Sequence, residues 1–110
     1  MLEIKASELK DAFLDWAVGK CEYMRHSLES DFCGRVGYAW DYSTNWAKGG
    51  PIIEREFIDV VYCPGDAAWR ASMDMREKTH EQYGPTPLIA AMRCYVASKL
   101  GDTIEIPEEI

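Results

Sequence analysis

Two long stretches of the chain place apolar residues every three to four positions, which is the spacing of one buried helix face. The first covers residues 9–24, where Ser7 can cap the helix and Glu8 favours its positive end. The second covers residues 87–100, which follow the capping residue Thr86 and begin at a proline. The second stretch carries so little charge that we expect it to be buried on most sides.

Alternation of apolar and polar residues with a period of two predicts strands at residues 2–5, 36–42, 69–74 and 103–106. Gly49-Gly50-Pro51 predicts the start of a short helix, with the proline at its first position. The charged stretch 75–83 fits either a solvated helix or a loop, so both assignments stay open.

This order of elements predicts an α+β fold with a small, mainly antiparallel sheet and two longer helices packed on one of its faces. The sequence has no repeat, flexible linker or low-complexity segment, so we expect residues 1–110 to form a single domain. No apolar run approaches the roughly 18 residues of a membrane helix, and the first residues lack the pattern of an export signal. We therefore expect a cytoplasmic protein.

The net charge of -7 disfavours binding to nucleic acid, because that affinity depends on clustered basic residues that neutralise phosphates. The four cysteines form no Cys-x-x-Cys pair, which disfavours a disulfide framework. The nearest approach to a metal site is Cys21, His26 and Cys33, but these residues lack the paired spacing of zinc ligands. We expect free cysteines, no bound metal and no cofactor.

Residue patterns of common enzyme sites are missing from the sequence. It contains no Gly-x-Ser-x-Gly elbow and no glycine-rich phosphate loop. Glu54 and Glu56 stand two positions apart, so on a helix they point away from each other. Gly49-Gly50 could expose N–H groups to an anion, although a structural turn explains this pair equally well. We therefore expect no catalytic residues.

An aromatic cluster of Tyr38, Trp40, Tyr42 and Trp46 has two explanations. It could form an exposed binding patch, because Trp and Tyr are enriched at interface hot spots. It could equally form the inner face of a sheet. Trp46, which follows the predicted strand, is the best candidate for exposure.

Two blocks of the sequence, residues 42–56 and 84–101, resemble the NinX-like family of small lambdoid-phage proteins, a family of unknown function. Leu9 and Trp16-Ala17-Val18 resemble the beginning of the same family, whereas residues 22–37 and 74–83 depart from its pattern. Asn45 stands where Asp is usual. The resemblance implies an accessory phage or prophage protein in the host cytoplasm, and it supplies no catalytic residues.

The leading hypothesis is therefore a non-enzymatic factor that binds a host or rival-prophage protein, for example to counter an exclusion or defence system. The alternative is a small-molecule-binding protein or enzyme whose site forms around the 42–56 block, with His80 as a further candidate. Nucleic-acid mimicry is the third and weakest hypothesis. The expected binding residues are Tyr42, Ser43, Thr44, Trp46, Glu54 and Arg55.

Overall fold

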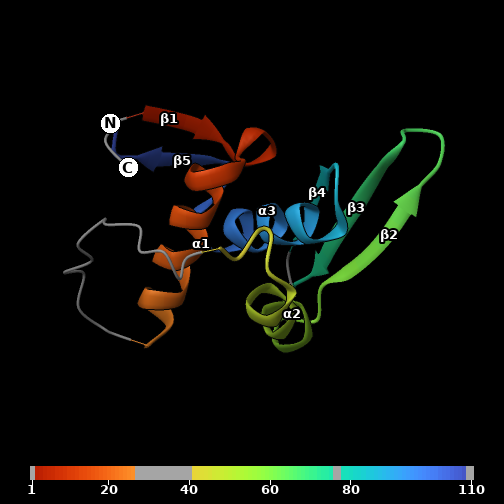
Figure 1. Cartoon of the computed structure of the whole chain (residues 1–110), viewed down its shortest axis with the longest axis horizontal. Helices are drawn as coiled ribbons and strands as arrows, with labels where there is room; N and C mark the ends of the chain where they lie inside the picture. Colours follow the sequence, from red (N-terminus) through yellow and green to blue (C-terminus); the bar gives the residue numbers. More distant parts are fainter. Residues whose placement is uncertain (1, 27–40, 76–77, 109–110) are drawn as a thin grey trace.

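The computed structural model describes residues 2–26, 41–75 and 78–108 (Figure 1). The elements in chain order are β1 (Leu2–Lys5), the short 3-10 helix η1 (Ala6–Glu8), α1 (Asp11–His26), α2 (Trp46–Arg55), β2 (Asp59–Cys63), β3 (Ala68–Asp74), β4 (Thr79–Gly84), α3 (Pro87–Leu100) and β5 (Thr103–Ile106). This mixture of helices and antiparallel strands confirms the predicted α+β class.

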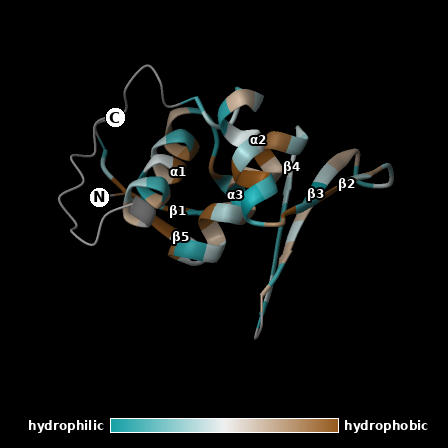
Figure 2. Cartoon of the chain, turned by 90° about the horizontal axis from the view of Figure 1, so that it is seen from below, coloured by the Kyte–Doolittle hydropathy of each residue, from teal (hydrophilic) through white to brown (hydrophobic). Residues whose placement is uncertain are grey.

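The described strands form two antiparallel sheets instead of the one that the sequence predicted. β1 pairs with β5 from Leu2–Ile106 to Lys5–Thr103, so the two ends of the chain lie side by side. β2, β3 and β4 form a second sheet in sequential order. Figure 1 shows the two sheets on opposite sides of α3, and Figure 2 shows hydrophobic and hydrophilic segments alternating along the helices.

Helix α3 forms the centre of the core. It packs against the β2-β3-β4 sheet, α1, α2 and β5. Eight of its residues are buried: Leu88, Ala90, Ala91, Met92, Cys94, Tyr95, Val96 and Ala97. The Thr86 hydroxyl accepts a bond from the Ile89 N–H at 3.1 Å, and the helix ends at Gly101 with φ at 93°. These features confirm the predicted caps and the burial on most sides.

The segment before α2 differs from the prediction. Tyr42 lies in a turn instead of a strand, and residues 36–40 of that predicted strand lie outside the described residues. α2 begins at Trp46, so Pro51 lies inside the helix instead of at its first position. The reason is a stronger cap upstream, because the Asn45 side chain accepts a bond from the Ala47 N–H at 2.9 Å.

Residues 79–83, from the stretch whose assignment the sequence leaves open, form strand β4 together with Gly84. Met75 and Lys78 exchange backbone hydrogen bonds of 3.0 and 3.2 Å, which closes a hairpin between β3 and β4. β4 pairs with β3 from Trp69–Gly84 to Asp74–Thr79. Its side chains alternate between exposed and partly buried positions, because only one face of the sheet packs against α3.

Three cysteines fall within the described ranges. Cys21 and Cys94 are buried, Cys63 is partly buried, and none of the three is in a disulfide. The side chain of His26 and all of Cys33 lie outside the described residues. Within the described ranges, no three potential metal ligands come together, and no helix is long and apolar enough to cross a membrane.

Candidate functional site

The predicted binding residues lie in two groups at opposite ends of α2. Tyr42, Ser43 and Thr44 form the turn that leads to the helix, Trp46 is its first residue, and Glu54 and Arg55 are its last two. A helix of 10 residues is about 15 Å long, so the two groups do not form one compact site.

The turn before α2 is held to α1 by a buried contact. Ser43 is 3% exposed, and its N–H donates a hydrogen bond of 2.9 Å to the Asp15 carboxylate. Burial raises the pKa of Asp15 above its ordinary value, although the bond from Ser43 opposes this shift. The buried position of Ser43 indicates that it stabilises the fold and is not available to a ligand.

Asp15→Asn is expected to leave the free energy of unfolding at pH 7 unchanged or slightly raised, because the amide oxygen still accepts the Ser43 N–H and the buried charge is removed. Asp15→Ala should lower it by about 1–2 kcal/mol, since the N–H loses its acceptor. Any stability that Asp15→Asn gains should vanish at a pH below 3.8, the ordinary pKa of the group. Asp15 is then protonated in both the folded and the unfolded state, so no buried charge remains to be removed. Urea denaturation across pH measures both effects, and equal losses in the two variants would contradict the assigned role.

Asn45 connects the turn to the helix through both ends of its amide. Its oxygen caps α2, and its nitrogen donates to the Asp41 carboxylate at 3.1 Å. Lys48 forms an ion pair of 2.9 Å with the same carboxylate, and these partners lower the pKa of Asp41. An Asp at position 45 could accept the cap bond but could not donate to Asp41.

Arg55 lies in a charged network that joins α1, α2 and α3. Its Nη atoms donate to the two Glu22 carboxylate oxygens at 3.1 and 2.7 Å, and its Nε donates to Glu56 at 2.8 Å. The Tyr95 hydroxyl donates to Glu22 at 2.7 Å, and Lys99 pairs with Glu56 at 3.4 Å. Burial opposes ionisation of Glu56, but the charges of Arg55 and Lys99 outweigh it and lower its pKa.

A cavity of about 270 Å³ adjoins this network. It is lined by Cys21, Met24, Glu56, Tyr95 and Lys99. Burial raises the pKa of the Cys21 thiol to about 12, so the thiolate needed for nucleophilic chemistry is not populated at neutral pH. Glu56 and Lys99 neutralise each other, and the network therefore has a structural role.

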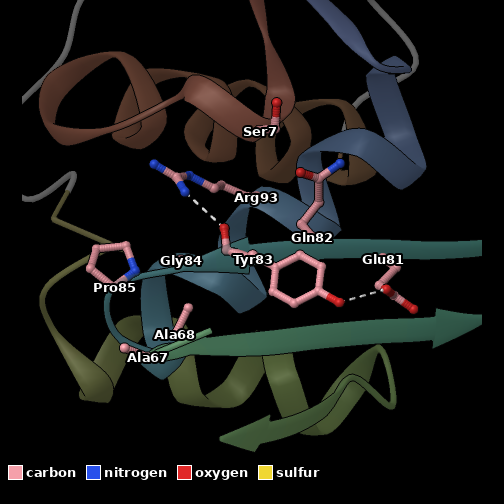
Figure 3. A pocket seen from close by; sticks show the side chains of 9 residues that line it. All are labelled: Ser7, Ala67, Ala68, Glu81, Gln82, Tyr83, Gly84, Pro85 and Arg93. Carbon is pink, nitrogen blue, oxygen red and sulfur yellow. Dashed lines mark hydrogen bonds between the residues drawn. The ribbon is translucent and has the colours of Figure 1, made fainter. Parts of the chain in front are cut away.

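A wider, more open pocket of about 530 Å³ lies where η1 approaches β4 (Figure 3). Its lining residues are Ser7, Ala67, Ala68, Glu81, Gln82, Tyr83, Gly84, Pro85 and Arg93. Arg93 donates bonds of 2.7 Å to the carbonyls of Leu9 and Tyr83, which ties α3 to both neighbours. Among the described residues, Arg55 bonds to Glu22 and the His80 carbonyl accepts from the Cys94 thiol, and no hydrogen bond or ion pair joins His80 of β4 to Glu54 or Arg55. This disfavours the catalytic grouping considered for the alternative hypothesis.

Phe57, which follows the C-cap residue Glu56 of α2, is a candidate binding residue that the sequence did not predict. It is 86% exposed and has φ at 54°, in the left-handed region. Its N–H donates to the Glu54 carbonyl at 3.4 Å, and the Ile58 N–H donates to the Ile53 carbonyl at 3.0 Å. These bonds define a Schellman motif in which Phe57 occupies the position usually taken by glycine. The sequence signal that could have identified Phe57 is the absence of a glycine just after the helix.

Trp46, at the other end of α2, is 55% exposed, as the sequence predicted. Exposed apolar side chains therefore flank the helix at both ends, and Val61 and Tyr62 of β2 are each 47% exposed. Such side chains are more typical of a binding surface than of an enzyme site, which needs convergent polar groups in a pocket.

The fold and these surfaces define a small α+β protein whose most prominent exposed groups are aromatic. A model of the protein family described as "Bacteriophage P22, NinX" matches residues 5–99, so the chain belongs to this phage protein family. The match confirms the family that the sequence resembles. No curated protein sequence matches the chain.

Proposed function

We propose that this phage accessory protein is a non-enzymatic factor that binds a host or rival-prophage protein in the host cytoplasm, for example a component of an exclusion or defence system. The observation that carries this proposal is Phe57, a large aromatic side chain held almost fully in water.

Phe57 lowers the stability of the isolated chain in two ways. A left-handed backbone costs a residue with a Cβ atom about 1–2 kcal/mol, a cost that glycine avoids. The exposed ring also forgoes the stabilisation that burial would give it. Strained and exposed aromatic residues are typical of binding surfaces, where a partner supplies the missing contacts. Trp46 provides a second exposed aromatic ring at the far end of α2.

The small-molecule alternative has less support. Arg55 is the main charged group of its proposed site, and its guanidinium already donates to Glu22 and Glu56. Ser43, another member of that site, is buried. A ligand would have to displace these internal contacts before it could bind.

Phe57→Gly is expected to raise the free energy of unfolding by about 1 kcal/mol while abolishing capture of the partner. A substitution that stabilises the fold but abolishes binding indicates a residue that is retained for contact with another molecule. Thermal unfolding measures the first effect. Affinity capture from host lysate, with quantitative mass spectrometry of the bound proteins, measures the second.

Ala67→Gly is the matched control, because Ala67 has φ at 50° in the turn between β2 and β3 and its replacement relieves similar strain. A host protein retained by the wild type and by Ala67→Gly, but lost by Phe57→Gly, would support the proposal. Capture of the same proteins by all three would refute the role of Phe57. Trp46→Ala tests the other end of the helix in the same assay.

A further inference from the structure

Arg93 of α3 is a cation that is held in place without a carboxylate partner. Its Nε and Nη1 atoms donate bonds of 2.7 Å to the backbone carbonyls of Leu9 and Tyr83, and these bonds fix the plane of the guanidinium. Among the described residues, its Nη2 atom makes no hydrogen bond and no carboxylate forms an ion pair with it. The described part of the chain therefore leaves this positive charge without a negative partner.

Arg55 shows the opposite environment for the same residue type. Burial opposes the charge of Arg55, but its bonds to Glu22 and Glu56 outweigh this effect and raise its pKa. Arg93 has no such compensation, and burial lowers its pKa. Its guanidinium is nevertheless charged at neutral pH. A partly desolvated cation with unused donors is stabilised when an anion occupies the space beside it.

The guanidinium borders the open pocket of about 530 Å³ between η1 and β4 (Figure 3). Ser7 and Gln82 contribute a hydroxyl and an amide to the lining, and both groups are neutral donors. Glu81 is the only carboxylate among the described lining residues. It accepts a bond of 3.2 Å from the Tyr83 hydroxyl, and Figure 3 shows it on the opposite side of the pocket from the guanidinium. The side of the pocket next to Arg93 therefore suits a negative ligand.

We propose that this pocket binds a carboxylate group through the Arg93 guanidinium, with Ser7 and Gln82 as neighbouring donors. A carboxylate is planar and carries a single charge, so it matches one guanidinium better than a doubly charged phosphate does. The group can come from a small free acid or from a peptide. The net charge of -7 opposes neither source strongly, because salt screens charges beyond about 10 Å. This inference does not depend on the proposed binding of a protein at Phe57.

NMR titration of the wild type at constant pH and ionic strength tests the site. Succinate is the free acid, and a tripeptide with blocked ends and a central glutamate is the peptide source. The tighter ligand should shift the Arg93 Nε–H signal and the backbone amide signals of Ser7 and Gln82 with a Kd on the order of 1 mM, and it identifies the source. Succinamide, the neutral analogue, should shift none of them. The absence of a saturable shift with both acids would overturn the proposal.

Gln82→Glu should weaken the binding of the tighter ligand at least about tenfold, because the new carboxylate competes for the guanidinium. Thr103→Glu, on β5, adds the same charge outside the pocket and should change the Kd less than about twofold. Glu81→Gln should instead tighten binding by about two- to threefold, since it removes the carboxylate from the lining. All three variants keep the carbonyl bonds of Arg93, and circular dichroism verifies that they fold. Equal effects of Gln82→Glu and Thr103→Glu would contradict binding in this pocket.

Discussion

Replacing Arg55 with methionine is expected to lower the free energy of unfolding by about 3–5 kcal/mol at pH 7. Methionine keeps the long apolar stem but removes every donor, which leaves the carboxylates of Glu22 and Glu56 without their shared cation. Their side chains are only 17% and 15% exposed, so water replaces the lost contacts poorly. Lys99 offsets part of the loss at Glu56, at a distance of 3.4 Å.

Urea denaturation of the wild type and Arg55→Met measures this loss. Lys48→Met is the control, because its pair with Asp41 is more exposed and should contribute less than about 1 kcal/mol. The lowered pKa of Glu56 means that its contribution is present above its ordinary value of 4.5 and is lost as the pH falls through its folded value. The deficit of Arg55→Met should therefore shrink in acid. A deficit no larger than that of Lys48→Met would show that the network contributes little.

Helix α3 was predictable because several local signals agree, whereas the expected cap of the first helix was wrong, since Ser7 lies in η1 and α1 begins at Asp11. For α3, the cap at Thr86, the proline at the first position and the stop at Gly101 all lie within the segment that they define. Its near absence of charge also indicated burial, and the structure confirms it. Local sequence determines a helix well when caps, propensity and apolar spacing point to the same bounds.

The partition of strands between two sheets was not predictable from alternation. β1 pairs with β5 across almost the whole chain, and this pairing depends on how α1 and α3 bring the ends together. β4 shows little apolar alternation because its partly buried positions carry the polar residues His80 and Gln82, although its burial does alternate. Periodicity identifies a strand by its burial, so a polar edge strand gives a weak signal.

The candidate site shows the same limit. Arg55 and Glu22 stand 33 positions apart, and nothing in the local sequence indicates that they form a two-pronged ion pair. Residue type favoured Arg55 as a binding residue, whereas its contacts give it a structural role. Phe57 was overlooked because its importance lies in a backbone angle and an exposed fraction, and neither is visible in residue type.

Gly49 and Gly50 offer the sharpest test of how α2 packs, because adjacent and identical residues should respond with opposite signs. A Cβ atom added at Gly49 would lie 2.6 Å from the Tyr42 carbonyl oxygen and 2.5 Å from a Leu88 methyl carbon. The backbone oxygen cannot move without disrupting the turn. Gly49→Ala should therefore lower the free energy of unfolding by at least about 2 kcal/mol.

Gly50→Ala should instead raise the free energy of unfolding by about 0.5–1 kcal/mol, since alanine favours the helix and the nearest atom lies 3.8 Å away, in the Trp46 ring. Thermal and urea unfolding of the two single variants measure the difference directly. The sequence alone predicts similar behaviour for both, because a helix that begins at Pro51 would leave the two glycines together in a flexible turn. Similar stability changes in the two variants would therefore favour that earlier assignment over a helix that begins at Trp46 and presses Gly49 against α3.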